Sequence, residues 1–299
     1  MPELPDIVVY IEALERRILG HVLERVQVAG PFLLRTATPP IDSAHGRTVK
    51  VLRRVGKRIA IGFDNDIWLV FHLMISGRLH WSERRVTPDG RRVLGAFYFD
   101  TGTLTLTEAG TQKRASLHLL EGEAELAQLD AGGIDALSTD RDLFWTTLTS
   151  SNHTLKRSLT DPHLFSGIGN AYSDEILFHA RLSPVMQTQR MKPEEISRLY
   201  EATTKTLTHW TEKLRAETGD KFPEKVTAFR PGMAVHGRYR QPCLVCGTKI
   251  QRIRYASNET NYCPRCQTKG KLLADRALSR LLREDWPQSL EGLEERKSR

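Results

Sequence analysis

The sequence predicts an α+β protein with more than one domain. Three observations support this: apolar residues at helical spacing open the chain, strand-like patterns follow, and helical patterns then lead to a hairpin with paired cysteines. The chain has 299 residues. At roughly 100–200 residues per domain, this length corresponds to two domains, each large enough to bury a core.

The composition is that of an ordinary globular chain. Hydrophobic residues make up 39% and charged residues 27%, which argues against intrinsic disorder. The longest apolar stretch, Ile67 to Ile75, contains His72 and is far shorter than the roughly 20 residues that span a bilayer. No signal sequence opens the chain. We therefore expect a cytoplasmic protein without a membrane partner, associated with the nucleoid if the source is bacterial.

The first half is predicted to be one helix followed by a β-rich domain. Apolar residues recur at helical spacing between Pro5 and Leu19, and Pro5 suits the first turn of a helix. From Val22 to Leu120 the chain contains short β-rich runs, such as Arg58 to Phe63. Glycines and acids near Leu129 to Asp135 mark the boundary of this domain.

The second half is predicted to be helical up to about Thr218 and to end in a hairpin. Lys249 to Tyr255 alternates like a strand, and Ser257 to Thr260 is expected to form the turn. A further helix is expected to begin at Ala277. The expected division is an N-terminal domain at 1–128, a linker at 129–139, a helical domain at 140–236, a cysteine-bearing finger at 237–276 and an extension at 277–299.

Four cysteines form the most specific binding motif. Two C-x2-C pairs are separated by sixteen residues: Cys243, Cys246, Cys263 and Cys266. Tetrahedral zinc takes four thiolates, so this spacing predicts one structural Zn²⁺ in a closed site with no position left for catalysis. Four free thiols and two disulfides are the alternative interpretations.

The positive charge of the chain is concentrated around these cysteines. The whole chain carries a formal charge of +8, and residues 237–276 contain nine Lys or Arg against two acids, a net +7. An excess of one sign at this density predicts contact with phosphates. A solvated charged surface is the simpler alternative.

The amino terminus offers a nucleophile. Removal of Met1 would leave Pro2 as a secondary amine, and an α-amino pKa of roughly 7.7–8.0 provides a useful neutral fraction. Such an amine can attack an electrophilic carbon and form an iminium ion, with Glu3 as a general acid or base beside it. Many proteins begin with Met-Pro, however, and an acid at a helix start also suits the helix dipole.

Two further segments carry candidate binding residues. Gly167 to Asn170 is typical of a tight turn in which Asn170 caps the following helix, whose free N–H groups can hold a phosphate. Lys156 belongs to a short helix before this turn, and Lys57 follows a glycine at a strand junction. Taken singly, a capped structural turn and a solvated lysine are the simpler explanations of these residues.

Together and in this order, the motifs resemble the formamidopyrimidine-DNA glycosylase and endonuclease VIII family. The matching segments are Met-Pro-Glu-Leu-Pro at the start, Gly-Lys57 before a strand, Gly-Ile-Gly-Asn170 followed by Asp-Glu-Ile-Leu-Phe, and Pro-Cys-x-x-Cys-Gly-Thr to Cys-Pro-x-Cys-Gln267. The resemblance implies a β-sandwich led by the catalytic helix, then a helix–two-turn–helix domain with a zinc finger. It also implies a monomeric base-excision repair enzyme acting on double-stranded DNA with oxidised bases or abasic sites.

The resemblance implies a role for each matching residue. The roles are Schiff-base nucleophile for Pro2, proton donor for Glu3, DNA contact and catalytic assistance for Lys57, phosphate binding for Asn170, DNA binding from the preceding helix for Lys156, and a structural role for Glu175. The enzyme would flip a damaged nucleotide out of the duplex. Pro2 would then displace the base at C1′, and the iminium would drive β,δ-elimination of both phosphates.

Departures from the family pattern affect the expected DNA contacts. Asp6 stands where a glutamate is usual, and His72 to Gly77 reads His-Leu-Met-Ile-Ser-Gly, so either Met74 or Ile75 must fill the void left by the flipped nucleotide. Glu108 to Arg114 lacks the phenylalanine found in purine-specific members. The preferred lesion, oxidised purine or oxidised pyrimidine, and the opposite base therefore stay open.

The finger carries a departure of its own. Asn258 occupies the position from which the family offers an arginine to phosphates, and Arg252 or Arg254 is the candidate replacement. The altered residues suggest a second hypothesis, a non-enzymatic sensor of damaged DNA. Retention of Pro2 and Glu3 argues against it. A zinc-ribbon transcription regulator, the third hypothesis, leaves the amino-terminal motif unexplained.

Overall fold

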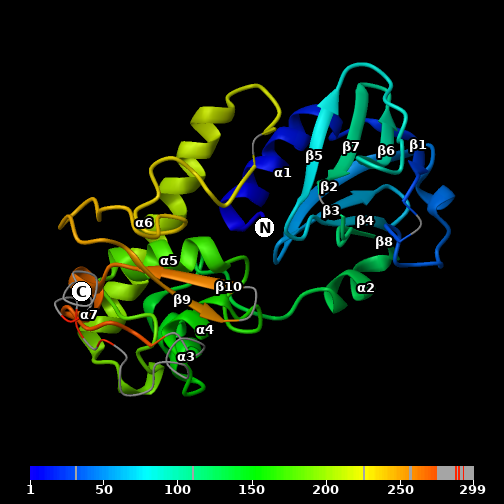
Figure 1. Ribbon diagram of the computed structural model, residues 1–299. Helices are drawn as coiled ribbons and strands as arrows, with labels where there is room; N and C mark the ends of the chain where they lie inside the picture. Colours follow the sequence, from blue (N-terminus) through cyan, green and yellow to red (C-terminus); the bar gives the residue numbers. More distant parts are fainter. Residues whose placement is uncertain are drawn as a thin grey trace. The chain divides into compact units, whose positions relative to one another are not determined.

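A computed structural model describes most of the chain, in two compact units (Figure 1). The described residues are 1–30, 32–109, 111–224, 226–255, 258–274, 287, 289 and 292. The first unit comprises Met1–Gly133 and His209–Ala228, and the second comprises Ile134–Thr208 and the chain from Phe229 onward. The predicted division into five segments stays a prediction, and the expected helix after Ala277 lies outside the described residues.

The first unit is a β-sandwich made from one antiparallel sheet of eight strands. The strand order is β5-β7-β6-β1-β2-β3-β4-β8. The bounds are β1 Val22–Val28, β2 Arg47–Val55, β3 Arg58–Phe63, β4 Ile67–His72, β5 Gly77–Ser82, β6 Val93–Phe99, β7 Gly102–Glu108 and β8 Ser116–Glu121. Strand β1 joins β2 through a short register of two residue pairs. The sheet folds over there, and Phe71 meets Phe97 across the core at 4.8 Å between ring centroids.

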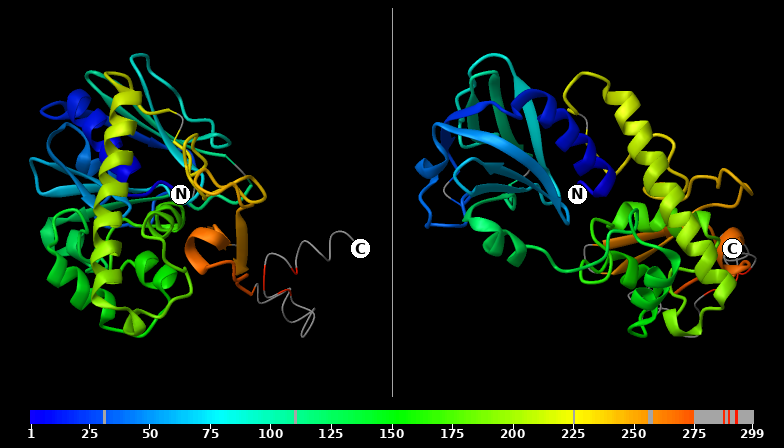
Figure 2. Two further views of the ribbon diagram at one scale, coloured as in Figure 1. Left: turned by 90° about the vertical axis from the view of Figure 1, so that its left-hand side faces the viewer. Right: turned by 180° about the vertical axis from the view of Figure 1, so that it is seen from behind.

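Helix α1 (Leu4–Ile18) completes this core, as its apolar spacing predicts. It lies against β2 and β3 (Figures 1 and 2), with Ile7, Leu14 and Ile18 fully buried. A short helix, α2 (Gly122–Gln128), follows β8, and a 3-10 turn (Ile41–Ala44) precedes β2. The end of helix α6 (Pro193–Thr218) also belongs to this unit, where Arg215 forms a two-point ion pair with Glu12 on α1.

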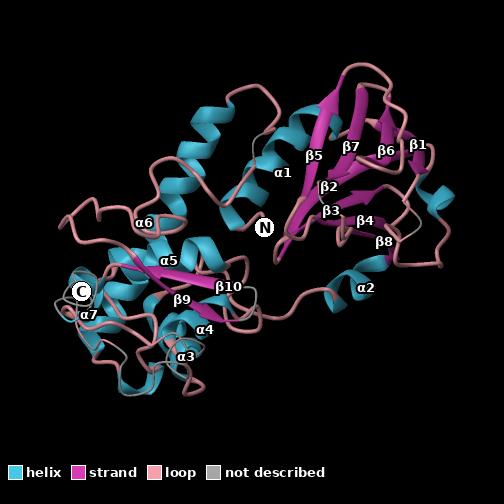
Figure 3. Cartoon of the chain, viewed as in Figure 1, coloured by secondary structure: helices cyan, strands magenta, loops and turns pink. Residues whose placement is uncertain are grey.

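The second unit is helical, with a small hairpin (Figure 3). Its helices are α3 (Arg141–Thr149), α4 (Leu155–Thr160), α5 (Asn170–His179), the first part of α6 and α7 (Pro264–Thr268), with a 3-10 turn at Thr188–Arg190. Asp140 caps α3 by accepting the N–H of Leu143 at 2.8 Å. Helix α5 is almost entirely buried. It therefore provides a fixed platform for the residues around it.

Strands β9 (Gln251–Tyr255) and β10 (Asn258–Tyr262) form the hairpin. The predicted turn at Ser257 to Thr260 is wrong for residues 258–260, which pair with β9 in register from Asn258 opposite Tyr255. Asn and Thr favour turns, but pairing with β9 gives the backbone N–H and C=O groups of alternate residues a hydrogen-bond partner on the neighbouring strand. This gain outweighs the turn preference. Within the described part of the chain, no helix has the length and apolar character needed to cross a membrane.

Candidate functional site

The amino terminus of the first unit is buried and capped. Pro2 is buried, and Glu3 is 3% exposed. Glu3 and Asp6 form a reciprocal capping box at the start of α1, in which the Asp6 carboxylate accepts the Glu3 N–H at 2.9 Å. The shorter side chain at position 6 thus suffices for this contact. The capping box fixes the carboxylate of Glu3 beside Pro2.

Positive side chains surround the terminal amine. Burial lowers the pKa of the Met1 α-amino group, and Arg78 and Lys57 lower it further, whereas Glu3 and Asp6 act in the opposite direction. Lys57 occupies the tight β2–β3 turn behind Gly56, which has a φ of +60°. The structure therefore brings Lys57 into the electrostatic range of the amino terminus. Arg78, which the sequence motifs do not single out, joins it there.

His72 belongs to the same positive region. It ends β4 opposite Arg58 in the β3–β4 pairing. Burial lowers the pKa of His72 to about 4, with further lowering by Arg58, Lys57 and His118. The imidazole is therefore neutral at pH 7 and can accept or donate one hydrogen bond without adding charge.

A tight turn after His72 presents one apolar side chain to solvent. The N–H of Gly77 donates to the carbonyl of Leu73 at 2.8 Å, and a Cβ at position 77 would lie 2.3 Å from that oxygen, so only glycine fits. Arg78 binds the carbonyl of Ile75 at 3.1 Å. Met74 takes a left-handed φ of +51°, and Ile75 is 59% exposed. Ile75 is thus the residue that the turn displays.

A buried carboxylate connects this turn to the loop after β7. Glu108 is 2% exposed; its carboxylate accepts from the Ser76 hydroxyl at 3.1 Å and from the N–H groups of Arg114 and Ala115 at 2.9 and 3.0 Å. Arg114 in turn donates to the side-chain oxygen of Gln112 at 2.9 Å. The loop that lacks the phenylalanine therefore displays a paired glutamine and arginine.

In the second unit, Asn170 lies between α4 and the hairpin. The prediction that Asn170 caps α5 is wrong, because Gly169 is the N-cap and Asn170 is the first helical residue. As the N-cap, Gly169 offers no capping side chain, and the Asn170 carboxamide donates from Nδ2 to the carbonyl of Glu259 on β10 at 2.8 Å. Lys156 of α4 donates to the Asn170 carbonyl at 2.7 Å. Asn170 is thus held on both sides.

The hairpin arginines share one acidic partner. Arg254 pairs with Glu259 across the strands, so their side chains share one face. Arg252 Nη1 lies 3.0 Å from the Glu259 carboxylate and its guanidinium lies 4.0 Å from the Tyr239 ring centroid, whereas Arg254 Nε is 3.6 Å from Glu259. The side chain of Arg254 is 60% exposed and that of Arg252 only 27%. Asn258 starts β10, and its side chain lies outside the described residues.

The four cysteines converge on one point. Their sulfurs all lie within 4.8 Å of one another, with Cys246 Sγ 3.5 Å from Cys263 Sγ and Cys243 Sγ 3.9 Å from Cys266 Sγ. Tetrahedral coordination with Zn–S bonds of about 2.3 Å separates sulfurs by about 3.8 Å. No disulfide joins any two of these cysteines, and all four sulfurs gather in one cluster rather than in two bonded pairs, which argues against the alternative of two disulfides. Their arrangement fits a closed zinc centre with four thiolate ligands.

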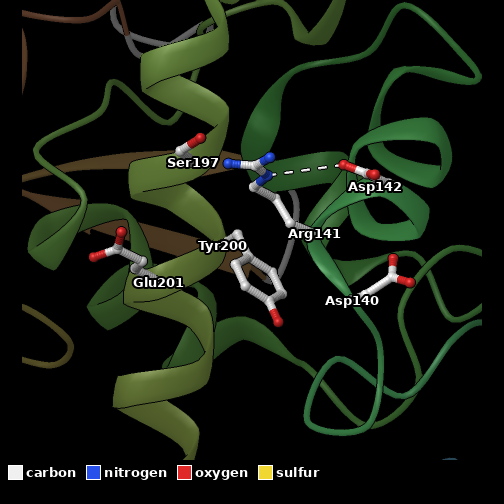
Figure 4. A pocket seen from close by; sticks show the side chains of 6 residues that line it. All are labelled: Asp140, Arg141, Asp142, Ser197, Tyr200 and Glu201. Carbon is white, nitrogen blue, oxygen red and sulfur yellow. Dashed lines mark ion pairs between the residues drawn. The ribbon is translucent and has the colours of Figure 1, made fainter.

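A separate pocket of about 450 Å³ lies in the second unit (Figure 4). Its lining residues come from the start of α3 and from α6: Asp140, Arg141, Asp142, Ser197, Tyr200 and Glu201. The ion pair drawn there joins Arg141 Nε to the Asp142 carboxylate at 3.8 Å. Three acids face one arginine, which does not suit a phosphate ligand. None of the residues predicted from the sequence lines this pocket.

Three segments of the chain match known domain families. Residues 1–115 match the formamidopyrimidine-DNA glycosylase N-terminal domain, and residues 133–218 match the formamidopyrimidine-DNA glycosylase H2TH domain. Residues 240–269 match a zinc finger found in FPG and IleRS. This match and the sulfur geometry identify the four cysteines as the ligands of one structural Zn²⁺.

Whole-chain comparisons agree with these matches. A formamidopyrimidine-DNA glycosylase of Heliobacterium modesticaldum is 33% identical over 281 residues, covering 89% of this chain and 100% of the relative. The MutM (Fpg) protein of Thermus thermophilus superposes with a TM-score of 0.74 at 29% identity, covering 89% of this chain and 98% of that one. The Fpg protein of Lactococcus lactis, in complex with DNA containing an abasic site, has the same fold, with a TM-score of 0.78 at 23% identity over 89% and 99% of the two chains.

Proposed function

Because this chain belongs to the formamidopyrimidine-DNA glycosylase family of base-excision repair, we propose that it is a bifunctional DNA glycosylase and abasic-site lyase. The observation that carries the proposal is the amino terminus: a buried Pro2 precedes a buried, capped Glu3, and burial, followed by Arg78 and Lys57, lowers the pKa of the Met1 α-amino group. We propose that the same surroundings act on the Pro2 amine once Met1 is removed and supply the unprotonated amine that nucleophilic attack requires.

The reaction begins after Met1 has been removed. The Pro2 nitrogen attacks C1′ of the damaged nucleotide and breaks the glycosidic bond, while Glu3 donates a proton so that the sugar ring can open. The product is an iminium ion whose positive nitrogen acidifies the C2′ hydrogen. Loss of that proton expels the 3′ phosphate, a second elimination expels the 5′ phosphate, and water then releases the enzyme. Burial and the nearby cations Arg78 and Lys57, which lower the pKa of the Met1 α-amino group, would likewise favour the neutral form of the Pro2 amine before attack.

The proposed partner is double-stranded DNA with an oxidised base or an abasic site, bound by a monomer in the cytoplasm. In the second unit, Asn170 retains a donor for a phosphate, because its Nδ2 carries two hydrogens and one is used on Glu259. Arg254 is the exposed cation of the hairpin and the better candidate to replace the arginine that position 258 lacks. Arg252, held by Glu259 and Tyr239, supports the hairpin instead.

Ile75 is proposed as the wedge that fills the void. We expect Ile75→Ala to lower kcat/KM on lesion-containing duplex by about 10-fold or more, because the exposed side chain can no longer offset the cost of unstacking a base step. Met74→Gly is the matched control and should stay within about 3-fold of wild type, since glycine suits a φ of +51°. Single-turnover excision assays check both values, and a larger loss in Met74→Gly would contradict the assignment.

A panel of duplexes tests the function as a whole. The lesions are 8-oxoguanine, formamidopyrimidine, thymine glycol, dihydrouracil and an abasic site, each with borohydride trapping. Excision of at least one lesion with a trapped covalent complex is expected. Tight binding to abasic DNA without excision or trapping would instead support the alternative, a damaged-DNA-binding sensor.

A further inference from the structure

A buried carboxylate at the centre of the second unit has no part in the proposed reaction. The side chain of Asp174 on α5 is fully buried. It forms an ion pair with Lys156 Nζ, accepts from His236 Nδ1 at 2.8 Å and accepts from the backbone N–H of Asn261 at 3.1 Å. One carboxylate thus connects α4, α5, the segment before the finger and strand β10.

Lys156 directs its charge inward. Its side chain is 14% exposed, and two of its three N–H donors are used, one on Asp174 and one on the Asn170 carbonyl at 2.7 Å. A buried ammonium beside a carboxylate forms a nearly neutral pair. Lys156 is therefore poorly placed to neutralise a DNA phosphate directly.

Strand β10 links Asp174 to the side chain of Asn170. The Asn261 backbone is bound by Asp174, while its side-chain Nδ2 donates to the Glu259 carboxylate at 2.8 Å. The carbonyl of Glu259 in turn accepts the Asn170 carboxamide at 2.8 Å. Asp174 thus fixes both anchors of Asn170: Lys156 on its main chain and β10 on its side chain.

The imidazole of His236 is fixed beside Asp174 by a backbone hydrogen bond and by a stacked aromatic ring. Its backbone N–H donates to the Glu175 carboxylate at 2.9 Å, and Phe229 stacks on the imidazole with 5.5 Å between centroids and 17° between planes. Gly237 makes room for this stack, because a Cβ there would lie 2.6 Å from the Phe229 ring. Only 7% of His236 is exposed, so water cannot readily replace its bond to Asp174.

We propose that Asp174 is the positioning residue of the phosphate site, and that Lys156 acts on DNA through Asn170 rather than by touching a phosphate. The proposal rests on the proposed function, because it assumes that Asn170 binds the DNA backbone. Asp174, Lys156 and His236 thus form one unit: the Asp174 carboxylate and the Lys156 ammonium neutralise each other, and His236 donates a hydrogen bond to the carboxylate.

The test compares Lys156→Met, Asp174→Asn and the double variant in binding to a duplex with a tetrahydrofuran abasic analogue across a salt series. Each single variant leaves one buried polar or charged group without its partner, so affinity should fall about 10-fold or more. The double variant removes both charges, so its affinity should be no lower than that of the weaker single variant: the two losses should not add, because both act on the position of Asn170. The slope of log affinity against log salt should match wild type throughout, since no cation that neutralises a phosphate is removed.

Direct contact between Lys156 and a phosphate predicts a different result: a slope smaller by about one in both variants that lack Lys156. That result would overturn the inference. Asn170→Ala is the reference variant: it should lose at least as much affinity as the single variants at an unchanged slope, because a carboxamide carries no charge. If the single variants do not fold, His236→Phe removes one bond to Asp174 but keeps the stack. It should weaken binding about 3-fold or more at an unchanged salt slope, and an affinity equal to that of wild type would refute the proposal.

Failure of the wild-type protein itself to bind abasic DNA would instead refute the proposed function.

Discussion

A chain with one glycine added ahead of Pro2 will form at least about 1000-fold less borohydride-trapped complex with abasic DNA than the chain that begins at Pro2. The extension converts the Pro2 nitrogen into an amide, whose lone pair is delocalised into the carbonyl and cannot attack C1′. The added glycine still offers a primary amine, but one residue away from the position that Glu3 and the capping box define. Gel quantification of the trapped complex measures the effect.

Two controls separate chemistry from folding in this experiment. Binding to a tetrahydrofuran duplex should change by less than about 3-fold in the extended chain, since the buried start of α1 is otherwise intact. Glu3→Gln keeps an oxygen for the capping box, so it should fold, trap preformed abasic sites and lose base excision. Trapping by the extended chain at the level of wild type would contradict the role of Pro2.

Loss of one zinc ligand should unfold the finger and remove DNA binding. In Cys263→Ser we expect the zinc content to fall from about one ion per chain to near zero, because structural zinc supplies roughly 10–16 kcal/mol of folding free energy in isolated fingers. The apolar cluster around Phe178, Val235 and Ile250 is too small to replace the folding free energy that the zinc ion supplies. Affinity for duplex should fall by about 100-fold or more as the hairpin cations become disordered.

Hydrogen exchange and metal analysis check this prediction. Backbone amides of residues 237–255 and 258–272 should lose protection, whereas those of the β-sandwich should keep theirs, because the described apolar cores of the sandwich and the finger share no residue. Leu244→Ser changes the other C-x2-C pair of the same site, at a side chain that is 65% exposed, and should retain zinc. A folded, DNA-binding Cys263→Ser protein without metal would show that the finger does not depend on zinc.

The strongest sequence signals were local. The spacing of the four cysteines predicted a cluster that the structure assembles, and the apolar period after Pro5 predicted α1 within one residue at each end. The family resemblance was also readable from short motifs, and the matched domains cover them. In each of these cases, the residues that determine the feature lie within about one element of each other.

The predictions that failed or stayed open concerned longer-range contacts. Asn170 was predicted to be a helix cap because it follows the turn glycines Gly167 and Gly169 and precedes a helix, but its carboxamide bonds to Glu259, 89 residues away. The proposal of Ile75 rather than Met74 required the folded turn, in which Ile75 is 59% exposed and Met74 takes a left-handed φ of +51°. Asp174 likewise has no sequence signature, since its partner Asn261 is 87 residues away.

The amino-acid sequence was enough to identify the family, the zinc ligands and the candidate nucleophile, because periodicity and motif spacing record chemistry between near neighbours. The folded chain was needed to show which side chain the turn displays, how the terminal amine acquires its positive surroundings and how Asp174 joins four segments. Buried charges and backbone donors take whichever partners the fold brings to them, and no local pattern specifies those partners.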